Sequence, residues 1–253
     1  MVASEMESLQ KLKSYFIANI THEFRTPLSA ISASMEYLLE ELEQLTKAEI
    51  KELLTSVNLS VSSLQTLVDN LLESTSIESG NFKVFVQPIE IMDVVDEAVR
   101  IVLPLFHRRE QTLVIESPAR LPIIQGDQTR LVQVLVNLLS NASKFGPIGQ
   151  TVTLGLDASE RSKLRVSVID QGSGVSIGSK EDLFRQFIHT DARTDSLYGI
   201  GLGLSMVKAI IEEHAGSVGM DVEEQGGARF WFTVPCVPDA EKYAGTPRVV
   251  AKQ

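Results

Sequence analysis

Apolar residues in the first third of the chain recur at three- and four-residue steps, which is the spacing of one face of an α-helix. The stripe of the first predicted helix consists of Leu9, Leu12, Phe16, Ile20, Phe24, Ile31, Met35, Leu38 and Leu42. A capping box at 46–49 (Thr-Lys-Ala-Glu) then opens a second amphipathic helix, which Gly80 ends. The pattern predicts two long helices joined by a short turn, an αα-hairpin.

A lone αα-hairpin leaves most of its apolar stripe in water. Two hairpins that pair into a four-helix bundle bury that stripe, so we expect a homodimer. We assign residues 1–80 to this all-α domain and place its boundary near Gly80.

From residue 81 onward the pattern changes to the alternation typical of β-strands. Strands are predicted at 82–86, 112–115, 151–156, 164–169, 217–222 and 230–234, with helices near 93–109, 128–144 and 202–214. Gln225-Gly226-Gly227 predicts a hairpin between the last two strands. The whole chain is therefore expected to be multi-domain, with an α+β two-layer sandwich at 81–236 and a flexible tail at 237–253.

Composition narrows the choice of partners and compartment. The 253 residues suffice for two domains, and a net charge of −10 argues against a nucleic-acid or anionic-membrane surface. The single cysteine, Cys236, cannot form an internal disulfide, and no apolar run reaches the roughly 18 residues of a membrane span. We expect a cytoplasmic protein, or the cytoplasmic portion of a longer membrane-bound one.

His22 is the first candidate for chemistry. It lies about 200° around the helix from Ile20, so it faces solvent, and a lone histidine there is most often an ordinary surface residue. The adjacent carboxylate of Glu23 can raise the basicity of the imidazole, whose neutral form is a competent nucleophile. Pro27 lacks a backbone N–H and should bend the helix just after this position.

A second candidate lies on the predicted helix at 128–144. Asn137, Asn141 and Lys144 are four and three residues apart and share one face, while Leu131, Val134, Leu135, Leu138 and Leu139 take the other. Two amides and an ammonium group on one face suit hydrated Mg²⁺ and phosphates. The alternative is an ordinary solvated face.

A third candidate follows the predicted strand at 164–169. Asp170 is followed by Gly172 and Gly174, which permit a sharp turn and close approach of a ligand. An ionised carboxylate only accepts hydrogen bonds, so it suits an amino group such as the adenine N6. The alternative is a plain β-turn.

A fourth candidate is the glycine run Gly199-Ile-Gly201-Leu-Gly203, which opens the predicted helix at 202–214. Glycines before a helix let backbone N–H groups reach phosphate. The run follows a long polar loop rather than a strand, so it is not the dinucleotide fingerprint. Such a loop suits a lid, with Phe184 and Phe187 as its anchors.

In this order, the motifs resemble those of the sensor histidine kinases of two-component signalling. His22–Pro27 is similar to their H box, Asn137–Phe145 to the N box, Asp170–Gly174 to the G1 box, Leu183–Phe187 to the F box and Gly199–Gly203 to the G2 box. The resemblance covers about residues 8–235. It implies a dimerisation and histidine-phosphotransfer hairpin followed by a Bergerat-type (GHKL) ATP-binding domain.

The resemblance also implies roles for the residues of the hairpin and the N box. His22 would accept the γ-phosphoryl group of ATP, with Glu23 as its orienting group and base. Thr26 would support dephosphorylation of the partner regulator. Asn141 would hold Mg²⁺ with help from Asn137.

For the nucleotide itself, the family pattern places Lys144 on phosphate, Phe145 near the base and Asp170 on the adenine amino group. The remaining ATP-binding positions are glycines: Gly172, Gly174, Gly199, Gly201 and Gly203, the last two with backbone groups at the phosphates.

The implied reaction is ATP-dependent phosphorylation of His22 and transfer to an aspartate on the receiver domain of a response regulator. Related ATPases carry a water-activating glutamate four residues before the metal-binding asparagine, where this chain has Asn137, which cannot act as a base. A degenerate nucleotide-binding scaffold and a phosphatase-dominant protein are the alternatives. The turn at 43–48 leaves open which subunit phosphorylates His22, and we expect the interdomain hinge at 76–81.

Overall fold

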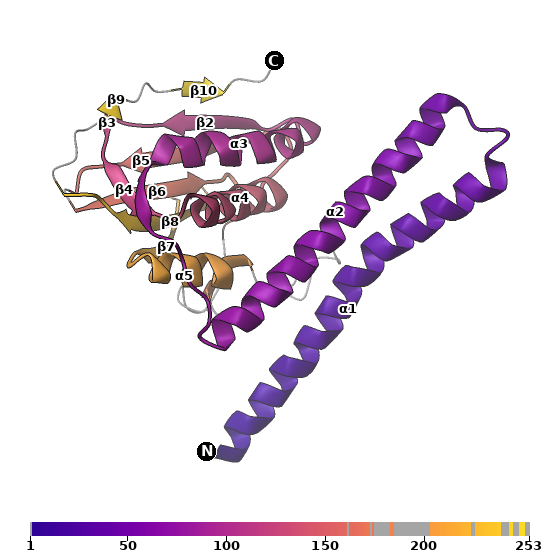
Figure 1. Cartoon of the computed structure of the whole chain (residues 1–253), viewed down its shortest axis with the longest axis horizontal. Helices are drawn as coiled ribbons and strands as arrows, with labels where there is room; N and C mark the ends of the chain where they lie inside the picture. The colour runs from indigo at the N-terminus through magenta and orange to yellow at the C-terminus, as the bar shows by residue number, and fades with distance from the viewer. Residues whose placement is uncertain are drawn as a thin grey trace. The chain divides into compact units, whose positions relative to one another are not determined.

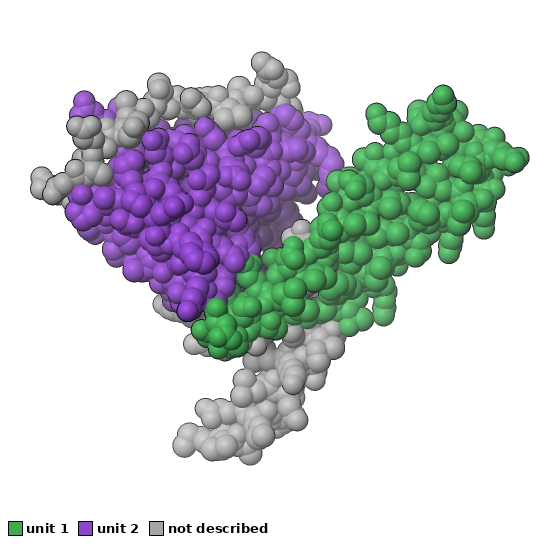
Figure 2. All heavy atoms as spheres, viewed as in Figure 1, with its two compact units in different colours: residues 1–81, 193–202 green, residues 82–192, 203–253 purple. Residues whose placement is uncertain are grey.

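The computed structural model describes residues 2–160, 162–172, 174, 183–184, 203–223, 226–238, 243–244 and 248–250 (Figure 1). These residues divide into two compact units, the first ending at Asn81 and the second beginning at Phe82 (Figure 2). Each unit has its own architecture, the first helical and the second a sheet with helices.

The first unit is an antiparallel hairpin of α1 (Val2–Glu41) and α2 (Lys47–Glu78) (Figure 1). Thr46 caps α2: its hydroxyl oxygen accepts from the Glu49 N–H at 3.3 Å, and the Glu49 carboxylate accepts from the Thr46 N–H at 2.8 Å. The predicted capping box is confirmed, and with it the start of the second helix.

Gly80 ends α2 as predicted. Its φ of 68° is left-handed, a conformation that costs an L-residue with a Cβ roughly 1–2 kcal/mol. The N–H of Asn81 donates to the Ser76 carbonyl and that of Gly80 to the Ile77 carbonyl, both at 3.0 Å. This pair of bonds is the Schellman motif, which satisfies the last carbonyls of the helix.

The second unit is built on a six-stranded mixed sheet with the order β10-β2-β5-β6-β8-β7. The strands are β10 (Arg248–Val250), β2 (Thr112–Glu116), β5 (Thr151–Asp157), β6 (Lys163–Ile169), β8 (Ala228–Pro235) and β7 (Ser217–Val222). Only the β2–β5 pair is parallel among these. Two short antiparallel pairs flank the sheet: β1 (Gln87–Glu90) with β4 (Ile123–Gly126), and β3 (Arg120–Leu121) with β9 (Tyr243–Ala244).

Three helices cover one face of this sheet: α3 (Ile91–Arg108), α4 (Gln128–Phe145) and α5 (Gly203–Glu213). Alternate residues of β6 point toward them, and Leu164, Val166 and Val168 are buried. Val166 lies opposite Phe232 of β8, which is fully buried. The predicted two-layer sandwich is therefore confirmed, because the helices cover one face of the sheet and alternate residues of β2, β5 and β6 are buried beneath them.

The strand predicted at 82–86 is wrong, since this segment pairs with none of the described strands and β1 starts at Gln87. The Phe85 N–H donates to the Asp127 carboxylate at 2.9 Å instead of to a neighbouring strand. Phe82 is buried beneath the Arg130 guanidinium, 5.0 Å from its ring centre. Contacts with the side chains of Asp127 and Arg130 thus hold this segment in place of the predicted strand pairing.

The C-terminal segment, expected as a flexible tail, contributes β9 and β10. β10 pairs with β2, placing Val249 opposite Val114 at the edge of the sheet. β-branched residues and an open strand edge favour this pairing. The sequence pattern does not predict the short strands β1, β3, β4 and β9. Segments of two to four residues are too short to show a recognisable alternation of apolar and polar positions.

In the described ranges, no helix has a stretch long and apolar enough to cross a membrane.

Candidate functional site

The H-box residues lie near the middle of α1. His22 is exposed, as its helical position predicted, Glu23 is half-buried and Thr26 is exposed. The Thr26 hydroxyl donates to the backbone carbonyl of His22 at 3.4 Å. α1 continues through Pro27, whose missing N–H leaves the Glu23 carbonyl without its helical donor.

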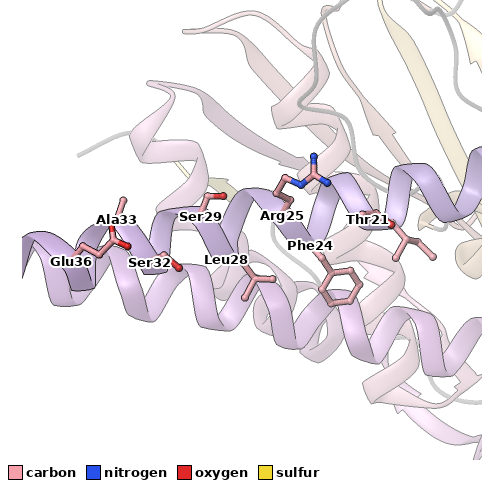
Figure 3. A pocket seen from close by; sticks show the side chains of 9 residues that line it. Thr21, Phe24, Arg25, Leu28, Ser29, Ser32, Ala33 and Glu36 are labelled. Carbon is pink, nitrogen blue, oxygen red and sulfur yellow. The ribbon is translucent and has the colours of Figure 1, made fainter.

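A pocket lies on α1 next to these residues (Figure 3). It is lined by Ile20, Thr21, Phe24, Arg25, Leu28, Ser29, Ser32, Ala33 and Glu36. The side chains of Phe24 and Leu28 project from the same side of the helix, and Leu28 is 49% exposed. The hairpin therefore leaves apolar surface open to water within two turns of His22.

The N-box residues project from α4. Asp127 caps this helix by accepting from the Arg130 N–H at 3.2 Å, and the apolar face of α4 is buried against the sheet and its neighbouring helices. Asn137, Asn141 and Lys144 are half-buried on the other face. The predicted division of the helix into an apolar and a polar face is thus present.

The two asparagines are tied together. Asn141 Nδ2 donates to Asn137 Oδ1 at 3.3 Å, which fixes the orientation of both amides. Among the residues that the structure describes, none donates to Asn141 Oδ1. An oriented amide oxygen is a ligand that Mg²⁺ accepts, with phosphates and water completing its six ligands. The residues present therefore fit a magnesium ion bound together with a nucleotide.

Gly203, the first residue of α5, sits against Asn137. A Cβ at Gly203 would lie 2.6 Å from Asn137 Oδ1, closer than atoms of this kind pack. The absence of a side chain at 203 therefore lets α5 begin beside the N-box amides. This contact joins the N box to the end of the glycine run that the sequence singled out.

Asp170 follows β6 and is 6% exposed. Its Oδ1 accepts from the N–H of Gly172 at 2.8 Å and from that of Ala228 at 3.4 Å. Burial raises the pKa of this carboxyl above the ordinary 3.8, and the two N–H groups oppose that rise. Within the described chain Oδ2 receives no hydrogen bond, so it remains an acceptor for a ligand's amino group.

The turn after Asp170 fits between α4 and the β7–β8 hairpin. A Cβ at Gly172 would lie 3.2 Å from the Phe145 carbonyl oxygen, and one at Gly227 would lie 2.0 Å from the Asp170 carbonyl oxygen. Gly174 and Gly227 have φ of 73° and 101°. The turn thus requires glycines on both sides.

The β7–β8 hairpin therefore has a second role, because its Ala228 N–H donates to the Asp170 carboxylate. Ala228 is not among the site residues that the sequence predicts, and Gly226 and Gly227 are predicted only to form the hairpin. The signal lay in the strand register: Ile169 pairs with Arg229, so the next residue, Asp170, lies beside Ala228.

Two aromatic residues also have defined places. Phe145 is 52% exposed, with Lys144 Nζ 5.9 Å from its ring centre. Phe184 is buried with Leu183, Met220 and Ala228, and its ring meets Phe230 edge-on at 6.4 Å. Phe184 therefore packs on β7 and β8, while the rest of the loop that it is expected to anchor lies outside the described residues.

The structure brings together the N-box face of α4, Gly203 and the Asp170 turn, through the contacts of Gly203 with Asn137 and of Gly172 with Phe145. Gly199, Gly201 and Phe187 lie outside the described residues. His22, Glu23 and Thr26 belong to the other unit.

Comparison with known proteins gives two family matches. Residues 12–80 match the "His Kinase A (phospho-acceptor) domain" and residues 126–238 the "Histidine kinase-, DNA gyrase B-, and HSP90-like ATPase". Together they include every candidate residue named above.

Two curated relatives are longer proteins. "Sensor protein KdpD" of Clostridium acetobutylicum is 30% identical over 227 residues, which cover 89% of this chain and 25% of the relative. "Sensory/regulatory protein RpfC" of Xanthomonas campestris is 31% identical over 251 residues, 97% of this chain and 34% of the relative. The chain thus spans about a quarter to a third of these relatives.

Among solved structures, full-length ShkA in complex with AMPPNP is similar, with a TM-score of 0.64 and 29% identity. The match covers 88% of this chain and 46% of ShkA.

Proposed function

Because the chain belongs to the sensor histidine kinases of two-component signalling, we propose that it is an ATP-dependent protein histidine kinase. It phosphorylates His22 and donates the phosphoryl group to an aspartate on the receiver domain of a response regulator. Residues 1–80 act as the dimerisation and phosphotransfer domain, and 81–236 as the ATP-binding domain.

The observation that carries this proposal is the pair of amides on α4. Asn141 offers a metal ligand, while Asn137, held 3.3 Å from it, offers no base to activate water. A site of this kind holds ATP for a nucleophile from elsewhere. The chain supplies that nucleophile as the exposed imidazole of His22, next to the carboxylate of Glu23.

In the bound state, Asp170 Oδ2 accepts from the adenine amino group, and Phe145 flanks the base. Lys144 and the backbone N–H groups of the glycine run, including that of Gly203, face the phosphates. Asn141 Oδ1 would hold Mg²⁺, and the ion would supply neutralisation of phosphate charge. Positioning and charge neutralisation then account for most of the acceleration.

In the transfer step, a ring nitrogen of His22 forms a bond to the γ-phosphorus while the bond from that phosphorus to the bridging oxygen breaks. ADP leaves, and the proton on the other ring nitrogen passes to Glu23. The phosphoryl group then moves from His22 to an aspartate of the receiver domain.

The test is incubation of the chain with γ-labelled ATP and Mg²⁺. We expect label that is lost in acid and stable in base, and that is absent from His22→Gln. Label on another residue would contradict the assignment of His22. Tight binding of ATP without any label would favour the nucleotide-binding scaffold.

A second activity is supported by Thr26. Its exposed hydroxyl lies one turn after His22 and donates to the His22 carbonyl at the long distance of 3.4 Å, so it can hold a water molecule beside a phosphorylated regulator. Thr26→Ala should then lose dephosphorylation of the regulator and keep autophosphorylation. Loss of both activities would assign Thr26 to the integrity of α1 instead.

We propose that the hairpin dimerises through a four-helix bundle. Leu28 and Met35 of α1 and Leu42, which directly follows this helix, are exposed at seven-residue spacing, and so are Leu54, Val61 and Val68 of α2. A repeat of seven places such residues on one seam facing another helix. The same surface contains the Leu28 side of the pocket on α1, which a second copy would cover.

We place this region in the cytoplasm, where ATP and response regulators are available. No nucleic-acid partner is proposed for a chain with this net charge of −10.

A further inference from the structure

Two buried glutamine side chains brace the C-terminal end of α4. Gln111 is 2% exposed and Gln150 is 4% exposed. A buried polar side chain is stable only if its hydrogen-bonding groups are satisfied. Neither role is predictable from the sequence, because an isolated glutamine fits a surface position equally well.

Gln150 bridges two parts of the nucleotide site. Its Nε2 donates to the Ala142 carbonyl of α4 at 2.7 Å, and its Oε1 accepts from the backbone N–H of Gln171 at 2.9 Å. Ala142 follows Asn141, and Gln171 follows Asp170. One amide group therefore connects the residues next to the metal-binding and the adenine-binding side chains.

The bridge stands where the β5–β6 ladder ends. Thr153 pairs with Ile169, and Thr151 and Gln171 would be the next partners of the same alignment. Instead, the Thr151 N–H donates to Gln171 Oε1 at 3.3 Å, and the Gln171 N–H donates to Gln150. The side chains of Gln150 and Gln171 thus accept the hydrogen bonds that the backbone ladder would otherwise form. The chain can therefore leave β6 and turn at Gly172.

Gly146 makes room for this bridge. A Cβ at Gly146 would lie 1.8 Å from Gln150 Nε2, although the backbone there, with φ −83° and ψ 163°, is open to any residue. The Gln150 amide therefore depends on the absence of a side chain at Gly146 as well as on its hydrogen bonds.

We propose that Gln150 is a positioning residue that holds the Asp170 carboxylate at a fixed place relative to α4, and so sets recognition of the adenine amino group. The inference rests on the proposed ATP site. Gln150 touches neither the base nor the phosphates in this role, and acts through the Gln171 N–H. Its loss should weaken ligands that carry a 6-amino group more than purine ligands that lack one.

The experiment compares binding of ATP and of purine riboside triphosphate, which lacks the 6-amino group, to the full chain with Mg²⁺. Gln150→Met keeps the volume and removes both hydrogen bonds. We expect the dissociation constant for ATP to rise about fivefold to tenfold, the equivalent of one hydrogen bond, and that for the purine analogue to rise less than about twofold.

Gln111→Met is the matched control. Gln111 Nε2 donates to the carbonyls of Ser143 and Pro147, at 3.0 and 2.9 Å, and its Oε1 accepts from the Ser143 hydroxyl. It braces the same end of α4 without touching the Asp170 turn. This variant should lower the thermal midpoint as Gln150→Met does, yet leave the preference for the 6-amino group unchanged.

Gly146→Ala is a second route if Gln150→Met does not fold, because the new Cβ displaces the Gln150 amide. It should show the same selective loss of ATP. Equal weakening of both nucleotides, or an equal change of preference in Gln111→Met, would overturn the role of Gln150 alone. Failure of the unaltered chain to bind either nucleotide would overturn the proposed function, and this inference with it.

Discussion

Asp170 shows how one buried carboxyl can be prepared for a ligand. Its Oδ1 accepts from the N–H groups of Gly172 and Ala228, and among the described residues no donor reaches its Oδ2, the oxygen that the proposed function assigns to the adenine amino group. Burial raises its pKa, so the fold favours the protonated form. In the free protein, the stability that this shift contributes is present below pH 3.8 and is lost as the pH rises through the raised pKa.

Binding of adenine should have the opposite pH dependence. A proton on Oδ2 would face the N–H of the adenine amino group, so the dissociation constant for ADP should rise as the pH falls toward the raised pKa of Asp170. In Asp170→Asn, affinity at pH 8 should be lower by about 10- to 100-fold, the effect of losing a charge-assisted hydrogen bond.

Calorimetric titration with ADP between pH 8 and pH 5 measures this effect, at constant free Mg²⁺. The variant and the unaltered chain share the titration of the ligand, so their difference isolates Asp170. An identical acidic limb in Asp170→Asn would assign the pH dependence to another group.

At the scale of elements, α4 and α5 meet through the contact of Gly203 with Asn137. Alanine at 203 would keep the backbone N–H and suit a helix better than glycine by up to about 1 kcal/mol. Its Cβ, however, would lie 2.6 Å from Asn137 Oδ1 and force that amide away from Asn141.

Gly203→Ala should therefore lower affinity for Mg²⁺-ATP by about fivefold to tenfold, the equivalent of one hydrogen bond, while thermal unfolding changes little. A double-mutant cycle supplies the control. In an Asn137→Ala background there is no amide to displace, so Gly203→Ala should have no further effect. The same loss in both backgrounds would point to the backbone of Gly203.

The start of α4 is also held by hydrogen bonds to other parts of the second unit. The Asp127 carboxylate caps the helix and holds the Phe85 N–H, while the Asp127 N–H donates to His214 Nε2 at 2.9 Å. Since Nε2 accepts, the proton of His214 is on Nδ1, which donates to the Ile210 carbonyl at 2.7 Å. One residue thus joins α4, the end of α5 and the segment that enters the second unit.

At the scale of the whole molecule, these contacts shorten the range of residues that can act as the hinge that the proposed function needs. The Schellman motif closes α2 at Gly80, and Phe82 and Phe85 are already held by Arg130 and Asp127. Residues 79–81 are therefore the last of the first unit and directly precede the anchored residues of the second. We expect the movement that brings ATP to His22 to pivot there, within the predicted range 76–81.

Dimerisation is tested at the same scale by two substitutions in α2. Leu54 belongs to the exposed seam with Val61 and Val68 and is 52% exposed, whereas Leu59, 57% exposed, points elsewhere on the helix. The unaltered chain should have twice the 27.8 kDa mass of one chain in light scattering. Leu54→Glu should shift it toward one chain, because a charge in a seam between helices is costly.

Leu59→Glu is the matched control, with the same chemistry, helix and exposure. It should leave the mass unchanged. A monomeric unaltered chain would contradict the dimer, and dissociation by both variants would place the contact elsewhere on α2.

The sequence by itself determined the elements whose signal is local. Helical periodicity, the Thr46–Glu49 capping box and Gly80 fixed the hairpin, and strand alternation identified the larger strands of the sheet. The candidate residues of α4 could be placed on one face for the same reason, since residues three and four apart in a helix are neighbours whatever surrounds them.

Only the tertiary structure decided which distant groups meet. The contact of Ala228 with Asp170, the room for Asn137 beside Gly203 and the bridge from Gln150 to Gln171 depend on strand register and helix packing. The segment 82–86 has the composition of a strand, yet the Phe85 N–H donates to the carboxylate of Asp127, 42 residues further along the chain. Such partners are set by the closure of the whole fold, which no local pattern of residues contains.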